Sequence, residues 1–429
     1  MLTSPTRQDS TSTSRATNRL AGIDGLRGFA AVWVMLFHIY AVSQAHFLHI
    51  PGVDAFFRKG YTGVSLFLVL SGFCLYVPFA GGRTEKFKTG EFFRRRARRL
   101  VPTYYAALLF AVVLSILGAS WLGFEAVGPA QLAWQVLTHL TFTQTLFPST
   151  YFGLNPSLWS LALEWHLYIG LPLLILGVRR FGLAYTVAAV FLWNVIYGVG
   201  LAVASRAGLI PAHSMAAVTL LPNQLFGRWA EFALGMVAAE LYVSGRLSKW
   251  TRPLKWWMLV IIAVVSAAIV KAGVLRVPVV MVKGLLFGAA VANLNLNPIM
   301  LGTIYFVLVS LVLARNNAIS RLFSWSPLVK IGTMSYSLYL THEPLVRALG
   351  YLVRRYTPQQ RFTLLIGAVP LIFGVAWCLF MLVERYSLRP AQPNAHGWPG
   401  ASVGGELWRR TRQGLRRLRA PALSAPEAE

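Results

Sequence analysis

The sequence has few charged side chains and almost no cysteine. Aspartate, glutamate, lysine and arginine together make 13% of the 429 residues, and only 14 residues are acidic. A water-soluble domain normally carries about a quarter charged residues, so the composition argues against one. The two cysteines, Cys74 and Cys378, lie inside apolar runs, which excludes a disulfide framework and disfavours a cysteine-based metal site. We expect no metal cofactor.

Apolar runs near the length of a bilayer crossing recur along the chain, and 56% of its residues are hydrophobic. A helix needs about 20 predominantly apolar residues to span a membrane, so we predict an all-α, polytopic transmembrane helical bundle. We interpret residues 279–296 as an additional re-entrant or interfacial segment. About ten spans are expected, at residues 24–44, 61–80, 101–120, 158–178, 183–204, 226–244, 255–273, 298–314, 328–350 and 362–384.

The basic residues are distributed unevenly between these spans. Eight Lys and Arg residues lie within 81–100, whereas 121–157 contains none. The net charge of +26 is therefore explained by the positive-inside rule and by contact with anionic lipid, and not by nucleic acid binding. We predict a multi-pass protein of the cell membrane with both termini in the cytoplasm.

Three regions follow from these patterns. Residues 1–21, rich in Ser, Thr and Arg, predict a cytoplasmic disordered arm, and residues 22–389 predict the transmembrane domain. Residues 390–429 form a basic tail in which leucines and a tryptophan alternate with arginines. This tail is either a short amphipathic helix on the inner leaflet or a solvated basic segment.

The first predicted span carries ionisable side chains through the membrane. Asp24, Arg27 and His38 lie within it, and because charges inside a span are costly, a functional role is the default hypothesis. Arg27 and His38 are eleven residues apart, which is about three helical turns and about 16 Å of rise. Both side chains should face one stripe of the helix. We predict that this stripe lines a path into the bilayer, with a cation at its inner mouth.

A cluster of arginines precedes the third span. Arg95, Arg96 and Arg99 are spaced for one helical face just before Pro102, and guanidinium groups bind phosphates well. The spacing favours a phosphate-binding site on the cytoplasmic side. Ordinary positive-inside anchoring is the alternative, although it does not explain the shared face.

The fourth span contains Glu164, about 9 Å below the outer surface if the helix starts at Leu158. His38 lies at the same estimated depth in the first span. A carboxylate beside an imidazole fixes the tautomer of the ring and stabilises its protonated form, as general-base catalysis requires. We predict that His38 is the base and that Glu164 orients it, although depth alone does not make them neighbours.

Two further spans hold polar side chains. In span 61–80, Ser71 stands among small residues that suit close helix packing. In span 328–350, Tyr336, Tyr339 and His342 suit either acceptor binding and oxyanion stabilisation or a satisfied hydrogen-bond network between helices. Both interpretations remain open at this point.

These stretches together carry a family resemblance. D-G-L-R-G-x-A-A begins at residue 24, R-R-x-x-R-x-x-P at 95, L-W-S-L-x-x-E at 158 and S-Y-S-x-Y-L-x-H-x-P at 335. In this order the motifs resemble the acyltransferase 3 family of polytopic membrane O-acyltransferases, over most of residues 22–390. The chain departs from the family pattern at Ser65, where many members have an acid, and at Trp165 and His166, which replace the more usual Glu and Gln.

The resemblance implies roles for individual residues of an acyltransferase domain at 22–389. The arginines Arg95, Arg96 and Arg99, with Arg27 deeper in the membrane, would hold the phosphates of an acyl-CoA donor, most simply acetyl-CoA. His38, Glu164 and Arg27 would form the catalytic set. The side chains expected to bind substrate are Ser71, Trp159, Tyr336, Tyr339 and His342.

We therefore expect an enzyme that transfers an acyl group from cytoplasmic acyl-CoA to a hydroxyl. The resemblance implies a carbohydrate, glycolipid or envelope glycan as acceptor, and antibiotics or other small natural products of the macrolide type as an alternative. A transporter or flippase with an intramembrane His and Glu proton relay is a further alternative, but no paired set of broken helices supports it. The sequence indicates no oligomeric state.

Overall fold

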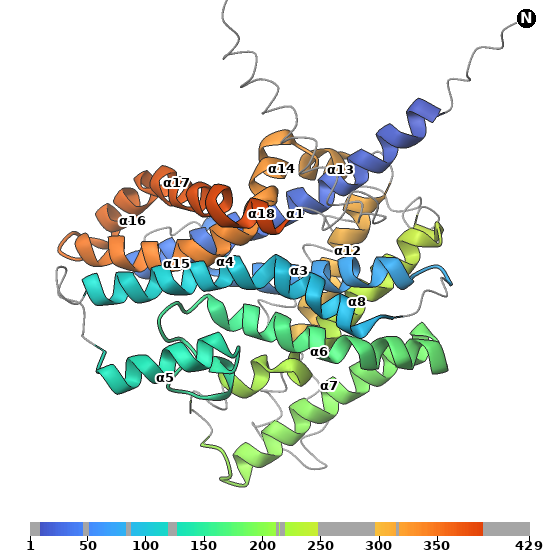
Figure 1. Ribbon diagram of the computed structural model, residues 1–429, viewed down its shortest axis with the longest axis horizontal. Helices are drawn as coiled ribbons and strands as arrows, with labels where there is room; N and C mark the ends of the chain where they lie inside the picture. The colour runs from blue at the N-terminus through green and yellow to red at the C-terminus, as the bar shows by residue number, and fades with distance from the viewer. Residues whose placement is uncertain are drawn as a thin grey trace, which may run out of the picture.

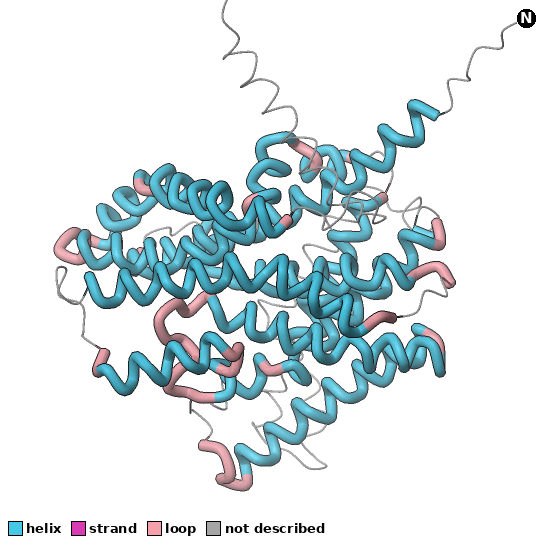
Figure 2. The backbone as a smooth tube through the Cα atoms, in the orientation of Figure 1, coloured by secondary structure: helices cyan, strands magenta, loops and turns pink. Residues whose placement is uncertain are grey.

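The computed structural model describes residues 9–45, 51–82, 87–118, 127–211, 214, 219–247, 297–314 and 317–388. Within these residues helices are joined by loops and turns, and there is no strand (Figure 2). The predicted all-α class of a polytopic membrane protein is confirmed.

The longer helices form a bundle (Figure 1). Their bounds are α1 (Asp9–Ser43), α3 (Gly63–Tyr76), α4 (Thr89–Leu117), α6 (Leu158–Phe181), α7 (Leu183–Arg206), α8 (Leu225–Val243), α12 (Asn297–Leu313), α15 (Ser335–Leu352) and α17 (Val369–Leu379). The shorter helices are α2 (Pro51–Arg58), α5 (Pro129–Leu140), α13 (Ala318–Phe323), α14 (Ser326–Thr333), α16 (Pro358–Gly367) and α18 (Arg385–Ser387). Single turns complete the fold, namely η1 (Gly60–Thr62), η2 (Val77–Phe79), η4 (Gln144–Leu146), η6 (Leu221–Asn223) and the π-helix η9 (Phe380–Glu384).

Six helices of the described residues are long and apolar enough to cross a membrane, and α12 contains a shorter apolar helix. The number of ten spans stays a prediction, because the predicted span 255–273 and the predicted re-entrant segment 279–296 lie outside the described residues. The basic tail at 390–429 lies outside them as well. Helix α1 begins at Asp9 and therefore overlaps the predicted arm of residues 1–21.

Two of the predicted spans are divided, which corrects the prediction of single helices there. Residues 328–350 form α14 and α15 with Met334 between them, and residues 362–384 form α16, α17 and η9 with Ala368 between α16 and α17. Pro370 lies in the first turn of α17. Proline suits a first turn and clashes with a preceding one, so Pro370 favours a helix start there. The hydropathy of the two predicted spans did not reveal these breaks.

Helix α3 packs against both α1 and α8 near the centre of the bundle. A Cβ atom on Gly72 would lie only 2.0 Å from the Phe232 carbonyl oxygen, and one on Gly235 only 2.1 Å from the Val69 carbonyl oxygen. The backbones of α3 and α8 are therefore in direct contact, as small residues permit between membrane helices. Helix α1 packs against both α3 and α15 (Figure 1).

The segment 141–157 between α5 and α6 is packed into the protein. Thr150, Tyr151 and Asn155 are fully buried, and the Gln144 side chain donates a hydrogen bond to the Leu158 carbonyl oxygen at 3.2 Å. The first turn of α6 therefore lies beneath this segment. On α5, burial lowers the pKa of His139, because a buried imidazole is harder to charge.

Candidate active site

A narrow cavity runs along the helices of the bundle, and we name it the slot. Its volume is about 160 Å³. On α3 its lining reaches from Val64 to Leu75, which is about 16 Å of helix rise. The slot is therefore long and thin. Its polar lining consists of Asp24, Arg27, Ser71, Arg96, Arg99, Ser160, Glu164, Tyr168, Tyr336, Tyr339 and Glu384.

Arg27 lies in the slot, toward the predicted cytoplasmic side. Its guanidinium group donates to Asp24 Oδ1 at 3.2 Å and to Cys74 Sγ at 3.1 Å. The ion pair with Asp24 offsets part of the desolvation cost of a charge inside the bundle. Arg27 is therefore one of the cations that line the slot, and its place at an inner mouth stays a prediction.

The three arginines of the predicted cluster divide between two environments. Arg96 and Arg99 line the slot, and the Nε atom of Arg96 is buried without a hydrogen-bond partner among the described residues. Arg95 instead pairs with Glu91, and its side chain is 60% exposed. The predicted shared face is therefore wrong for Arg95, because Glu91 one turn earlier draws its guanidinium to the helix surface.

Glu164 lies in the slot and is not the partner of His38. Its Oε1 atom accepts hydrogen bonds from Ser71 Oγ at 2.7 Å and from the Tyr168 hydroxyl at 2.6 Å. The predicted pairing with His38 is therefore wrong. The depth estimate failed to find the partner because depth does not fix which neighbour a side chain faces, and Glu164 faces Ser71 of α3.

Glu384 reaches the slot from the π-helix η9. Its carboxylate accepts from the Ser337 backbone N–H at 3.0 Å and from Ser337 Oγ at 2.5 Å. It therefore satisfies a free N–H group in the first turn of α15. Single π-helical turns occur frequently at functional sites, and here the turn places a carboxylate among the slot's guanidinium groups.

Tyr339 lines the slot and joins it to a pair of histidines. Its hydroxyl lies 2.6 Å from Ser160 Oγ, and its ring packs edge-on against Phe67 with a centroid distance of 5.6 Å. On its other side the ring centroid is 5.5 Å from that of His342. Ser71, Tyr336 and Tyr339 all line the slot, so these three predicted substrate-binding side chains lie together, and their role stays a prediction.

His342 and His38 lie next to each other beyond Tyr339, with ring centroids 5.2 Å apart. His342 Nδ1 is 2.8 Å from the Tyr339 carbonyl oxygen, so we assign the proton to Nδ1, which leaves Nε2 as an acceptor. This Nε2 atom is buried and has no partner among the described residues. A buried polar atom without a partner calls for a ligand group or an ordered water.

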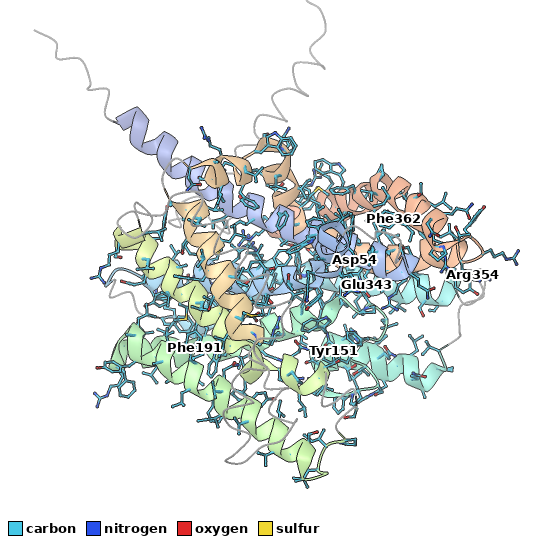
Figure 3. The ribbon with its side chains drawn as sticks, turned by 180° about the vertical axis from the view of Figure 1, so that it is seen from behind. Asp54, Tyr151, Phe191, Glu343, Arg354 and Phe362 are labelled. Atoms are coloured by element: carbon cyan, nitrogen blue, oxygen red, sulfur yellow. The ribbon has the colours of Figure 1, made fainter. Side chains whose placement is uncertain are left out.

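His38 faces a carboxylate that sequence reasoning missed. His38 Nδ1 lies 3.5 Å from Glu343 Oε1, and Glu343 is 1% exposed. Figure 3 shows Glu343 in the interior of the bundle and Arg354 at the edge of the molecule. Glu343 was overlooked because His342 and Pro344 define the motif around it. Its spacing of four residues from Arg347 inside an apolar helix was the available signal.

The predicted stripe that joins Arg27 and His38 is also corrected. His38 is not among the side chains that line the slot, because α1 changes neighbours along its length. Arg27 contacts Cys74 of α3, whereas His38 contacts α15. Arg27 and His38 were predicted to face the same side of the helix, but they do not line one cavity. Tyr339 lines the slot and contacts His342, so it lies between the slot and the histidines.

Trp159, like His342, is a predicted substrate residue that does not line the slot. Its ring stacks on Tyr151 at a centroid distance of 5.8 Å, so it holds the buried segment 141–157. In the described parts of the chain, no group of three or more His, Cys, Asp or Glu side chains could hold a metal ion.

A second buried charge pair lies outside the slot. Arg228 Nε is 3.0 Å from Glu231 Oε2, and Arg228 Nη2 is 3.2 Å from Ser65 Oγ. These contacts join α8 to α3. Ser65 is a position at which this chain departs from the family motif. Its hydroxyl contacts Arg228, and an acidic residue at the same position would place a second carboxylate, besides Glu231, beside that guanidinium group.

Known proteins resemble the chain over most of its length. A family described as an acyltransferase domain, acyltransferase 3, matches residues 20–381. Acyltransferase MdmB of Streptomyces mycarofaciens is 27% identical over 86% of this chain and 92% of MdmB. O-acetyltransferase OatA of Staphylococcus aureus is 24% identical over 76% of this chain and 50% of OatA. Peptidoglycan O-acetyltransferase OatA of Listeria monocytogenes is 26% identical over 76% of this chain and 49% of its own length.

The chain thus spans about half the length of the OatA proteins and nearly all of MdmB. No solved structure matches it. The family match sets aside the transporter alternative, because the matching proteins are named acyltransferases. The match covers far more than half of the residues, and the four motifs lie within or next to the slot. The chain therefore belongs to the acyltransferase 3 family and is a membrane acyltransferase.

Proposed function

We propose that this enzyme moves an acyl group from cytoplasmic acyl-CoA to a carbohydrate hydroxyl that approaches from the outer side of the membrane. One observation carries the proposal. The slot connects the guanidinium groups of Arg27, Arg96 and Arg99 with Tyr339. The Tyr339 ring adjoins His342, which in turn adjoins His38. The cationic end suits the phosphates of a long donor, and the histidine end suits proton transfer.

The size of the slot supports a division of the donor into two parts. At about 160 Å³ the slot is smaller than typical ligand pockets of about 300–1,000 Å³. It has room for a thin chain and not for a nucleotide. We therefore assign the pantetheine arm to the slot and the nucleotide phosphates to the guanidinium groups at its cytoplasmic mouth.

The proposed reaction needs a base beside the acceptor hydroxyl. The hydroxyl oxygen attacks the thioester carbonyl carbon while His38 takes the hydroxyl proton. The new carbon–oxygen bond forms, the carbon–sulfur bond breaks, and the coenzyme A thiolate leaves and receives the proton from His38. A well-placed base contributes about 10²–10⁴-fold to the rate, so other groups must contribute as well.

Hydroxyl groups near the histidines suit the stabilisation of the oxyanion. Ser160 Oγ donates to the Ser157 carbonyl oxygen at 3.1 Å, so the Tyr339 hydroxyl is the donor toward Ser160, and it can turn its proton to the oxyanion instead. A preorganised donor of this kind is typically worth about 10²–10³-fold. The acceptor hydroxyl itself can hydrogen-bond to the free Nε2 atom of His342.

The acyl group is proposed to be short, most simply acetyl. Apolar side chains of Val64, Phe67 and Leu161 line the slot on the Tyr339 side, and the small volume leaves no long channel for a fatty chain. Two of the matching relatives are named O-acetyltransferases, which supports the same choice.

The acceptor class rests on position and on the relatives' names. The histidines lie toward the predicted outer side, and one relative is named for peptidoglycan. We therefore propose a glycan or glycolipid of the cell envelope, with a small natural product as the alternative acceptor. The proposed orientation keeps both termini in the cytoplasm of a cell-membrane protein.

Two measurements test the proposal. Purified full-length protein in detergent should release coenzyme A from isotope-labelled acetyl-CoA, and the His38→Ala variant should release it about 10³-fold more slowly. Mass spectrometry of envelope glycans, lipids and secreted small molecules from cells with and without the gene should show an acetyl mass that depends on the gene. A lack of acetyl-CoA turnover in the wild type would refute the donor, and a lost acyl mass on a small molecule alone would select the alternative acceptor.

A further inference from the structure

We propose that Glu343 is the positioning residue for His38 and that the buried segment before α6 holds it in place. The inference rests on the proposed function, because it assigns to His38 the role of the base. It replaces Glu164, the carboxylate that the sequence favoured, with one that contacts α1 directly.

Each oxygen of the Glu343 carboxylate is held by at least one hydrogen bond within the protein. Oε1 accepts from Arg347 Nη2 at 2.9 Å and from Arg347 Nε at 3.1 Å, and Oε2 accepts from Ser157 Oγ at 2.6 Å. A carboxylate oxygen accepts about two hydrogen bonds, so Oε1 can bond His38 Nδ1, which lies 3.5 Å away, when one of its two Arg347 contacts lengthens. The side chain is 1% exposed, and a buried carboxylate held this way has little freedom to turn.

The sequence explains why this segment docks beside Glu343. Pro344 has no N–H group and therefore cannot bond to the Leu340 carbonyl one turn earlier. The Asn155 side chain donates to that carbonyl oxygen instead, at 2.7 Å, and its own Oδ1 accepts from the Ser157 backbone N–H at 3.2 Å. The proline next to Glu343 thus creates the site at which Asn155 binds, and Asn155 places Ser157 against the carboxylate.

The arrangement gives His38 the orientation that a base requires. A carboxylate beside Nδ1 keeps the ring proton on Nδ1 and leaves Nε2 free to take the proton of the substrate hydroxyl. The negative charge of the carboxylate then stabilises the imidazolium ion that forms. The 3.5 Å separation is longer than a normal hydrogen bond. Catalytic hydrogen bonds are often long without substrate and shorten in the reactive complex.

The test uses full-length protein in detergent with acetyl-CoA and an envelope acceptor fraction. Glu343→Gln keeps the shape but removes the charge, so we expect kcat to fall about 100-fold with the donor KM unchanged and the purified yield near wild type. The matched control is Glu240→Gln, which changes a carboxylate that caps the Gly81 N–H at 2.8 Å on the predicted cytoplasmic side. That control should keep wild-type kcat.

A second arm separates positioning from folding. In the His38→Ala background, Glu343→Gln should cause no additional loss, because a positioning residue acts only through the group that it orients. Equal losses in both backgrounds would refute the inference. If Glu343→Gln does not accumulate, Ser157→Ala removes one hydrogen bond and should lower kcat severalfold without changing the donor KM, and wild-type kcat in Ser157→Ala would refute the inference.

The outcomes also separate the inference from the proposed function. Wild-type turnover that is lost in His38→Ala and kept in Glu343→Gln would leave the proposed function standing and remove the positioning role. No acetyl-CoA turnover in the wild type would overturn both.

Discussion

The arginine end of the slot and the histidine cluster beyond its other end are built differently. At the first end Arg96 and Arg99 line a cavity, and one guanidinium nitrogen has no partner among the described residues. At the second end His342 and Glu343 are almost fully buried, and Glu343 is held by partners on α6 and α15. Open charges suit a ligand that arrives and leaves. Fixed, buried polar groups suit chemistry that depends on geometry.

The difference predicts two kinetic classes of variant. Changes at the arginine end should act mainly on the donor KM, and changes in the histidine cluster mainly on kcat. The kinetic constants of variants at the arginine end should therefore be compared with those of variants in the histidine cluster, on the other side of Tyr339.

The largest effect is expected for His38→Ala. Loss of the base should lower kcat by about 10³-fold, within the range typical of general bases, while the donor KM stays near wild type. Release of coenzyme A from labelled acetyl-CoA measures both constants, and membrane abundance by immunoblot is the control. Wild-type kcat in this variant would remove the histidine cluster from the mechanism.

Arg27→Ala should have the next largest effect. The substitution removes the contacts to Asp24 and Cys74 and a cation from the slot. Hydrogen bonds to charged groups are worth about 1.5–3 kcal/mol, so we expect kcat/KM to fall about 100-fold. Arg27→Lys keeps the positive charge but lacks the planar set of guanidinium N–H donors, so it should recover part of the lost kcat/KM. Equal activity of the Ala and Lys variants would contradict a role for the charge.

The sequence predicted the parts of the site that depend on one helix alone. Apolar length revealed the spans of α1, α3 and α6, and the rarity of charge inside them singled out Arg27, His38 and Glu164. All three lie in the slot or at the adjoining histidine cluster. A single helix, its period and its polarity are visible in a sequence.

The pairing of side chains could not be predicted in the same way. Glu164 and His38 were matched by depth, and α6 begins at Leu158 as predicted, but Glu164 contacts α3 whereas His38 contacts α15. Glu343 was missed because its importance comes from Ser157, 186 residues earlier in the chain. Contacts between distant segments depend on rotation and packing, which the period of one helix does not fix.

Glu164→Gln tests the corrected place of this carboxylate. Because Glu164 accepts from Ser71 and Tyr168 inside the slot, the substitution should raise the donor KM about tenfold, the effect of weakening one charge-assisted hydrogen bond by about 1.4 kcal/mol. The effect should add to that of His38→Ala, since the two residues have separate partners. Full non-additivity would restore the pairing that the sequence suggested.

The smallest effects should separate two arginines of the same helix. Arg99 lines the slot, whereas Arg95 is exposed and paired with Glu91. If the slot's mouth binds phosphates, Arg99→Ala should raise the donor KM about fivefold, and Arg95→Ala should leave it unchanged, because exposed ion pairs contribute about 0–1 kcal/mol. The Arg99 effect should shrink with rising ionic strength as salt screens the phosphates. Equal effects of the two variants would mean that the basic loop acts only through its total charge, and the distinction between lining and anchoring arginines would then be lost.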